Sequence, residues 1–465
     1  MGQSGSVDNP FTSEIAGFVS DFDLVNVPAE VINRAKLLFL DSLGCGLYGS
    51  QLDWTKKTIS ALASVDQTKS CSLMGGVEKL NPLHAALVNG TQIQGFELDD
   101  VHRKGILHVG AVTLPPLLAL SELNEDITGF DFLTAAIAGY EIGPRVGLCM
   151  GQEHIGQGWH SGATVGVFSA VAGAARLLKL SANQTTHALG IAGTQSSGLM
   201  AAQFGAMVKR MHAGKSAHSG LLAALLAKEN FTGIVDVFEA PYGGFCTTFS
   251  RSQDRFDLNQ LTAGLGLEFQ LMDIALKFYS CVGSNHTTLD AIKDIQKRRP
   301  FTEEEVKEIR VFGSQVTVDH VGWDYRPEGL TSAQLNLPFC VATLLLEGNV
   351  FVDQFKPDCV DNSQRIALSR KVRVIHEPEI TKRGAGYRHM VKVEIEFKAG
   401  DIENETREYP RGSEYDFASD VEIKDKFRVL AKNSISAGAI ERIVEMVMNL
   451  ETLSSASALA RALSE

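Results

Sequence analysis

The sequence predicts a mainly α-helical protein in which a smaller α+β domain is inserted into a large all-helical domain. Three observations predict this fold. Apolar residues recur at helical spacing over most of residues 11–268, alternate with a period of two in short runs within residues 269–410, and return to helical spacing within residues 411–465. We therefore expect one helical domain made of the first and third segments and an α+β domain made of the second. Residues 1–10, rich in Gly and Ser, are expected to form a disordered tail.

The helical segments begin and end at residues that suit helix ends. Pro28 fits the start of a helix that runs through Leu43, and Pro82 fits the start of a helix that leads into a charged stretch. Gly and Ala are frequent between residues 129 and 180, at spacings of three and four, so we expect the helices there to pack closely. The other expected helices cover residues 56–63, 129–150, 161–180, 214–229 and 422–464.

The expected α+β domain shows both kinds of periodicity. Residues 302–305 read as a capping box that opens a short helix. A strand is expected to follow over residues 308–312 and to continue towards Val318. Strict alternation predicts two more strands at residues 371–375 and 391–397, and Gly400 with Asp401 predicts a turn after the second of them.

Composition excludes several classes of function. The chain has 465 residues and a net charge of -12, which argues against a nucleic-acid partner because phosphate binding needs a clustered basic face. No apolar run reaches the roughly 18 residues of a membrane-spanning helix. The seven cysteines are scattered without a CxxC pair, as in a reduced compartment. The first 30 residues contain no Lys or Arg, so we expect no targeting peptide and a cytoplasmic location.

One stretch, residues 94–108, carries an unusual density of titratable groups. It contains three carboxylates, two imidazoles and two fixed cations between two apolar runs: Glu97, Asp99, Asp100, His102, Arg103, Lys104 and His108. A charged segment between buried segments is typical of a functional loop on a rigid scaffold. The alternative is a polar helix end in which Asp and His side chains cap each other.

Two more histidines stand just before expected helices rich in small residues. His160 precedes the expected helix 161–180, and His212 follows Lys209 and Arg210 before the expected helix 214–229. Free N–H groups at two helix N-termini, together with two cations, favour an anion such as a carboxylate. The alternative is that the histidines are helix caps or core residues and that the cations lie on the surface.

The motifs of several other chemistries are absent. His102 and His108 are six residues apart, there is no HExxH, and no Cys pair completes a zinc site, so no metal is expected. A divalent cation on Asp99 and Asp100 is the remaining alternative. No GxGxxG follows a strand and no GxSxG is present, so neither a dinucleotide cofactor nor a serine nucleophile is expected.

Three motifs together carry a resemblance to a known family. The motifs are residues 97–108, Gly158-Trp159-His160, and residues 205–214 with the sequence GAMVKRMHAG. They resemble the MmgE/PrpD family, which includes 2-methylcitrate dehydratase, cis-aconitate decarboxylase and iminodisuccinate epimerase. The similarity covers nearly the whole chain from about Phe11. It implies a helical domain interrupted by an α+β lid, a homodimer, and an active site between the domains.

The resemblance also implies roles for single residues. His108, His160 and Lys209 match active-site positions of the family, and we assign them catalytic roles together with Asp99. Phe339 appears in the segment Gln334–Phe339 where the decarboxylases carry a lid Tyr, which predicts that an alkyl-substituted substrate is preferred to cis-aconitate. The residues expected to bind substrate are Glu97, Asp100, His102, Arg210, His212, His286 from the lid side, and Phe339.

The predicted function is that of a cofactor-independent lyase acting on a small di- or tricarboxylate, similar to cis-aconitate decarboxylase. Lys209 and Arg210 would hold substrate carboxylates, while His108 and His160 would act as general acid and base because imidazole titrates near neutral pH. The same residues could serve a dehydratase of 2-methylcitrate or another alkylcitrate, or an epimerase. A carboxylate-binding dimer without catalysis is the alternative from another class.

Overall fold

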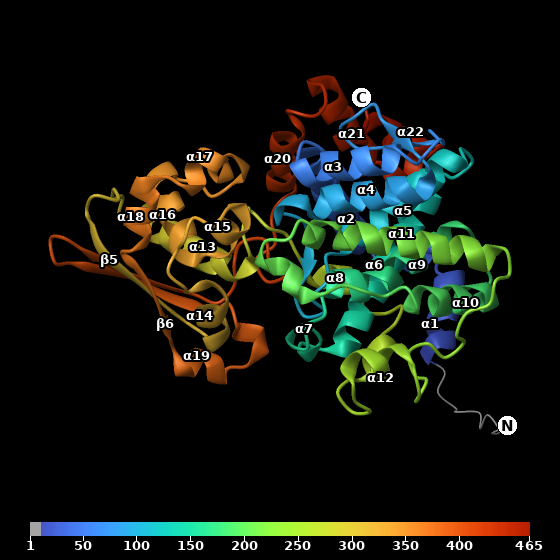
Figure 1. The fold of residues 1–465 in the computed structure, drawn as a ribbon, viewed down its shortest axis with the longest axis horizontal. Helices are drawn as coiled ribbons and strands as arrows, with labels where there is room; N and C mark the ends of the chain where they lie inside the picture. The colour runs from blue at the N-terminus through green and yellow to red at the C-terminus, as the bar shows by residue number, and fades with distance from the viewer. Residues whose placement is uncertain (1–10) are drawn as a thin grey trace.

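The computed structural model describes residues 11–465, so the predicted tail at residues 1–10 lies outside the described residues. Figure 1 shows a larger, mainly helical group built from both ends of the chain and a smaller group built from its middle. The larger group contains α1 (Phe11–Asp21), α2 (Ala29–Gly49), α3 (Asp53–Ala63), α4 (Pro82–Ile93), α5 (Val109–Leu123), α6 (Gly129–Met150), α7 (Glu153–Gly156), α8 (Ser161–Thr164), α9 (Gly166–Leu177), α10 (Ala182–Gly193), α11 (Val208–Lys228), α12 (Phe245–Ser250), α20 (Asp420–Ala431), α21 (Ala437–Met448) and α22 (Ser457–Ala462).

The smaller group combines short helices with a mixed sheet. Its helices are α13 (Gly283–Arg298), α14 (Gln315–Val321), α15 (Leu330–Leu335), α16 (Leu337–Glu347), α17 (Pro357–Val360), α18 (Ser363–Ser369) and α19 (Pro378–Lys382). Its strands are β5 (Val306–Gly313), β6 (Val372–His376), β7 (Val391–Phe397) and β8 (Ile402–Arg407), in the order β6-β5-β7-β8. Strand β5 runs parallel to β6 and antiparallel to β7, and β7 runs antiparallel to β8.

Two pairs of very short strands lie outside this sheet. Strand β1 (Cys71–Ser72) pairs with β2 (Lys79–Leu80), and β3 (Val101–His102) pairs with β4 (Ile274–Ala275). The second pair joins residues far apart in the sequence, and it positions part of the site described below.

The prediction of a mainly helical protein with strands in its middle segment is confirmed. Helix α6 has the predicted bounds, and its start is fixed by a capping box in which Thr128 accepts from the Asp131 N–H and Asp131 accepts in return. The helix predicted over 161–180 is interrupted at Val165, which separates α8 from α9. Among residues 11–465, no helix combines the length and the apolar composition that a membrane span requires.

Close packing of the small-residue helices is also confirmed. A Cβ atom on Gly139 of α6 would lie 2.8 Å from the Ser169 carbonyl oxygen of α9, and one on Gly143 would lie 2.6 Å from Ser169 Cβ. Only hydrogen fits at these two glycines, so the backbones of α6 and α9 can approach more closely than larger side chains would allow.

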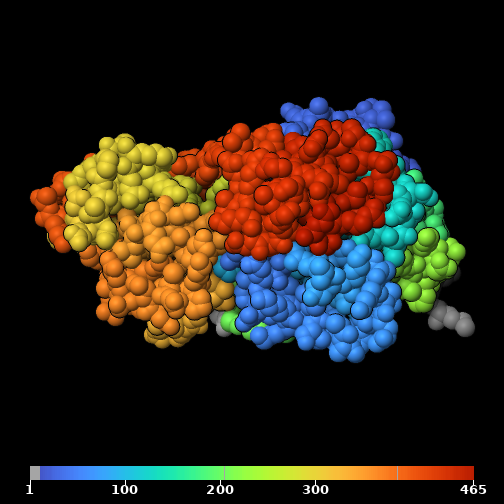
Figure 2. All heavy atoms as spheres, turned by 90° about the horizontal axis from the view of Figure 1, so that it is seen from above, coloured from blue at the N-terminus to red at the C-terminus, as the bar shows by residue number. Residues whose placement is uncertain are grey.

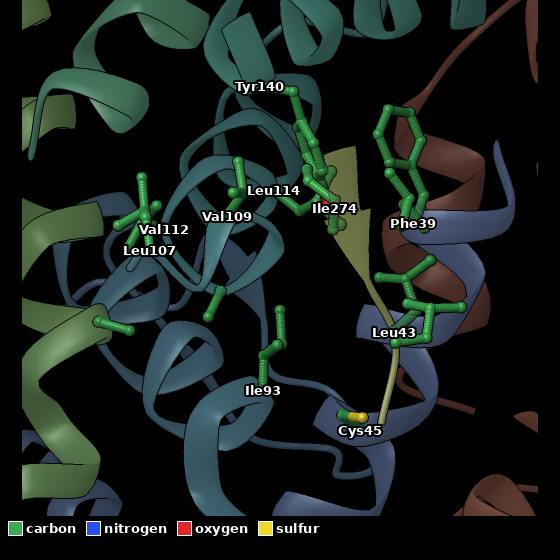
Figure 3. Close-up of a cluster of buried hydrophobic side chains, with 14 of the residues drawn as sticks. Phe39, Leu43, Cys45, Ile93, Leu107, Val109, Val112, Leu114, Tyr140 and Ile274 are labelled. Carbon is green, nitrogen blue, oxygen red and sulfur yellow. The ribbon is translucent and has the colours of Figure 1, made fainter. Parts of the chain in front are cut away.

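A buried cluster beneath the charged stretch comes from separate parts of the chain. Figure 3 shows Phe39 and Leu43 of α2, Ile93 of α4, Tyr140 of α6 and Ile274 of β4 around the start of α5. All five side chains are buried, as are Leu107 and Val109, which flank the last residue of the charged stretch. This apolar packing fixes both ends of residues 94–108 on the helices.

Two predictions in the smaller group are wrong. Residues 302–305 form a turn and no helix, because the Thr302 N–H donates to Glu305 Oε1 at 2.9 Å and strand β5 begins directly afterwards. The predicted strand does not continue towards Val318. It ends at Gly313, and Ser314 caps α14 by accepting from the Thr317 N–H.

The C-terminal helices return to the first part of the chain. Helices α20 and α21 pack against α2, and α22 packs against α5. Figure 2 shows this C-terminal segment in red against N-terminal residues in blue, with the yellow and orange middle segment to one side. Residues beyond 420 therefore join the helical group, and one of them, Lys426, reaches the charged stretch.

Candidate active site

The loop between α4 and α5 turns sharply at its first carboxylate. Glu97 has φ of 57°, a left-handed conformation that is uncommon for a residue with a side chain. Beyond it, β3 pairs with β4 so that Val101 faces Ala275 and His102 faces Ile274. Because Lys277 follows β4 by two residues, this pairing brings Lys277 next to Glu97, although the two are far apart in the sequence.

Glu97 is surrounded by three cations. Its Oε1 accepts from Lys209 Nζ and, at 2.8 Å, from Arg210 Nη1, while Lys277 Nζ lies 3.5 Å from Oε2. The four side chains are between 4% and 12% exposed. One carboxylate against three buried cations leaves an excess of positive charge, so this cluster can accept a further anion.

The charges of the cluster shift one another's pKa. Burial by itself would raise the pKa of Glu97, but Lys209, Lys277 and Arg210 hold that pKa well below its ordinary value. Burial lowers the pKa of Lys209, and Glu97 opposes the shift. Glu97 is therefore ionised at neutral pH and serves as the fixed counter-charge of the cluster.

Gln334 of α15 joins the cluster to the smaller group. Its Oε1 accepts from Arg210 Nη2 at 3.2 Å, and its Nε2 donates to the carbonyl oxygens of Phe96 at 3.1 Å and Ser280 at 2.9 Å. Gln334 has no exposed surface, so these bonds satisfy both ends of a fully buried amide. The site is thus built from residues of both groups.

His108 stands at the N-cap position of α5, next to a buried carboxylate. Its Nδ1 lies 3.0 Å from Asp99 Oδ2, and 15% of the His108 side chain is exposed while Asp99 has no exposed surface. Beneath them Lys426 of α20 donates to the Leu98 carbonyl oxygen at 2.8 Å and to Asp41 Oδ1 at 2.6 Å. The contact between Asp99 and His108 is close, although its angles do not form a hydrogen bond, and buried Asp99 cannot touch a substrate itself.

His160 and His212 form a second imidazole pair. Their Nδ1 atoms lie 2.9 Å apart, so one ring donates and the other accepts. Burial, followed by the charge of Lys209, lowers the pKa of both rings, and it lowers that of His160 to well below its ordinary value. Both imidazoles are therefore uncharged at neutral pH and can serve as hydrogen-bond partners.

With this geometry in place, comparison with known proteins decides the family. Residues 13–257 match the MmgE/PrpD N-terminal domain, and residues 279–452 match the MmgE/PrpD C-terminal domain. The chain belongs to the MmgE/PrpD family. The resemblance predicted from the three sequence motifs is thereby confirmed.

Relatives of this MmgE/PrpD protein span nearly its whole length. It is 36% identical to the cis-aconitate decarboxylase-like protein oryM of Aspergillus oryzae, over 96% of each chain. It is 33% identical to a cis-aconitate decarboxylase of Aspergillus terreus, over 95% of this chain and 93% of the relative. It is 26% identical to the cis-aconitate decarboxylase of Mus musculus, over 97% of this chain and 93% of the relative.

Two of the predicted substrate-binding residues of this MmgE/PrpD protein have structural contacts instead. Asp100 is fully buried and accepts from the Gly110 N–H at 3.1 Å, which caps α5. His102 is fully buried, its Nδ1 accepts from the Gly105 N–H at 2.9 Å, and burial lowers its pKa to about 4. Neither side chain has a surface that a substrate can reach, which corrects the prediction for both.

Two predicted residues of the smaller group are buried in contacts with residues outside the charge cluster. His286 on α13 is buried, with Nε2 3.1 Å from the Cys281 carbonyl oxygen. The prediction that Phe339 lines the substrate site is wrong. Its ring has no exposed surface and packs 4.4 Å from the Tyr325 ring and 6.1 Å from the Phe355 ring, because its place in the first turn of α16 faces the core.

The helix that carries Lys209 and His212 begins earlier than predicted. Helix α11 starts at Val208 instead of Gly214, so Lys209 and Arg210 lie in its first turn and His212 lies within it. The prediction that a helix begins directly after His160 is confirmed, although α8 has only four residues. The prediction that a helix begins after His212 is wrong, because His212 lies inside α11.

Sequence reasoning missed Lys277, Gln334 and Lys426. Lys277 and Lys426 lie in no local motif, and only the pairing of β3 with β4 and the return of α20 bring them to the site. Within residues 11–465, no three His, Cys, Asp or Glu side chains come together as a metal site would require.

Proposed function

We propose that this protein is a cofactor-independent lyase that releases CO2 from cis-aconitate or a close analogue. The observation that carries the proposal is the buried cluster of Lys209, Arg210 and Lys277 around the single carboxylate of Glu97, close enough to His108 for the two to interact electrostatically. The names of the relatives support the same reaction class.

The cations would bind substrate carboxylates. A charge-assisted hydrogen bond contributes about 1.5–3 kcal/mol, and a buried setting with low dielectric strengthens it. Arg210 is held by both Glu97 and Gln334, whereas Lys209 and Lys277 each pair with Glu97 alone, so these two lysines are the more available donors. A substrate carboxylate would share these cations with Glu97.

Decarboxylation then has two requirements. The substrate must take up the electron pair of the broken carbon–carbon bond, and the enzyme must supply one proton. The bond between the departing carboxylate carbon and the allylic carbon breaks, CO2 leaves, and the electron pair enters the adjacent double-bond system. The double bond shifts, and a proton adds to the carbon at the far end of that system. Substrate and one proton thus give CO2 and a dicarboxylate with a terminal double bond.

His108 is the proposed proton donor. Asp99 Oδ2 lies 3.0 Å from its Nδ1, which would leave Nε2 to face the substrate. His160 is assigned a different role from the general acid or base predicted from sequence, while His212 keeps its predicted role in substrate binding. With their lowered pKa values they would donate hydrogen bonds as neutral rings.

The arrangement of the whole protein remains part of the proposal. We assign residues 11–268 and 411–465 to a helical domain and residues 269–410 to a lid domain, with the site between them. A homodimer and a cytoplasmic location complete the proposal. The preference for an alkyl-substituted substrate is withdrawn, because Phe339 does not line the site.

Product analysis tests the function. Purified protein is incubated with cis-aconitate, citrate and 2-methylcitrate, and products are identified by mass spectrometry and CO2 release. Itaconate and CO2 from cis-aconitate are expected. Loss of water from 2-methylcitrate without CO2 would identify a dehydratase instead, and binding of all three compounds without turnover would identify a carboxylate-binding protein.

A further inference from the structure

A second polar cluster lies where the loop 94–108 meets the smaller group. Ser284 Oγ at the start of α13 lies 3.4 Å from His320 Nδ1 and 3.3 Å from His389 Nε2. Arg388 precedes His389, and its Nη1 donates to Gln152 Oε1 at 2.7 Å. The cluster therefore gathers hydroxyl, imidazole and guanidinium groups, all of which can donate to a carboxylate.

Gln152 also ties this cluster to the charged loop. Its Nε2 donates to the Lys104 carbonyl oxygen at 2.9 Å, so one amide binds both Arg388 and the residue after Arg103. The two guanidinium groups act on each other: burial and then the charge of Arg103 lower the pKa of Arg388 to about 10. Arg103 belongs to the helical group and Arg388 to the smaller group, so the cluster spans both.

The positive charge of this cluster is not balanced. Arg103 Nη1 pairs with Glu414 at 3.2 Å, while Arg388 has no carboxylate within salt-bridge distance among residues 11–465. Arg103 Nε has no hydrogen-bond partner in the same range, although only 10% of the side chain is exposed. The cluster thus has two guanidinium groups, one carboxylate partner and one buried N–H donor that is not used. This arrangement favours binding of an anion.

His320 connects this cluster with the charge cluster around Glu97. Burial lowers the pKa of His320, and the charges of Arg388 and Lys209 lower it further, while Glu97 opposes the shift. Charges from both clusters thus reach the same imidazole. His320 is exposed to solvent, yet neighbouring atoms surround its ring closely enough to lower its pKa. This combination is expected for a side chain in a cleft.

We propose that Arg388, Arg103, Ser284 and His320 form a second carboxylate subsite, which binds the carboxylate of a tricarboxylate substrate that lies farthest from Glu97. This inference rests on the proposed function, because it assumes that the Glu97 cluster binds the other carboxylates. A guanidinium and a hydroxyl match the planar carboxylate group. The subsite selects tricarboxylates over dicarboxylates, and its occupation draws residues of both groups together.

Calorimetry on the full chain tests the subsite without requiring turnover. Binding of propane-1,2,3-tricarboxylate and of succinate is measured for the wild type, Arg388→Met and His320→Asn. The wild type should bind the tricarboxylate at least about tenfold more tightly than succinate, and each variant should lose most of this ratio. His320 is exposed, so His320→Asn keeps the test open if Arg388→Met does not fold.

Two controls separate the subsite from other causes. Arg383→Met removes an exposed arginine of the smaller group that pairs with Glu408, and it should leave the ratio unchanged. Gln152→Ala removes the contact of Arg388 with the helical group but keeps the charge, so it should preserve most of the ratio. A wild type without preference for the tricarboxylate, or equal losses for both ligands in the variants, would overturn the subsite. If the protein keeps the higher affinity for the tricarboxylate but does not decarboxylate cis-aconitate, only the proposed function is refuted.

Discussion

The charge cluster makes one strong prediction, which concerns Glu97→Gln. The substitution keeps the shape of the side chain but removes the counter-charge of Lys209, Arg210 and Lys277. Breaking a buried ion pair by removal of one partner costs about 3–5 kcal/mol, because the remaining charge stays buried and unpaired. We expect the free energy of unfolding to fall by about this amount at neutral pH.

The loss should depend on pH in a defined direction. The pKa of Glu97 in the folded protein is well below its ordinary value of 4.5, so its contribution to stability is fully present above pH 4.5. That contribution is lost as the pH falls through the folded pKa, when the wild type also becomes uncharged at this position. The difference between wild type and variant should therefore stay constant near neutral pH and shrink only in acid.

An anionic ligand should partly reverse the loss. A ligand that binds only the folded protein stabilises it by about 2.7 kcal/mol at a concentration of a hundred times Kd. With Glu97 neutralised, three cations are free for a tricarboxylate, so citrate should stabilise the variant more than the wild type. Urea unfolding with and without citrate, followed by circular dichroism, measures both quantities.

A matched control distinguishes the loss of the Glu97 counter-charge from the loss of any buried carboxylate. Glu122 is a buried carboxylate of α5 that accepts from the N–H of Ser72 at 2.6 Å and from its hydroxyl at 2.7 Å. Glu122→Gln should lower stability without any added response to citrate. If Glu97→Gln has wild-type stability, or if citrate stabilises both variants equally, the charge argument for the site fails.

Further predictions concern the other residues of the site. Lys209→Ala should lower kcat/KM for cis-aconitate by at least about tenfold, the loss of one charge-assisted bond, and unchanged kinetics would remove Lys209 from the site. Asp99→Asn should lower kcat by about a hundredfold with little change in KM, because His108 loses its neighbouring carboxylate, and a changed KM alone would contradict this role. Incubation with EDTA should leave turnover intact, and activity restored by one divalent ion would show that a metal is needed. The free energy of unfolding of the wild type should decrease by up to about 1.4 kcal/mol per pH unit as the pH falls from 6.5 to about 4. In this range His102 binds a proton in the unfolded chain but not in the folded protein, where it is buried. The variant His102→Gln should therefore show a smaller decrease over the same range.

Residue patterns alone predicted most of the long helices, most strands and the family. Local apolar periodicity reports whether a segment is helical or extended and which face is buried, and it placed α6 and the strands β6 and β7 correctly. The motifs also marked Glu97, His108 and Lys209, which the structure brings together. The capping-box motif was misleading at residues 302–305, where the Thr302 N–H donates to Glu305 within a turn and strand β5 follows at once.

The partner of each charge could be identified only from the three-dimensional fold. Lys277 meets Glu97 because β3 pairs with β4, and Lys426 reaches the Leu98 carbonyl oxygen because α20 returns to α2. Neighbouring carboxylates such as Asp99 and Asp100 look alike in sequence, yet one faces His108 and the other caps α5. The physical reason is that periodicity reports burial within a segment, whereas charge pairing depends on contacts between segments that are distant in the chain.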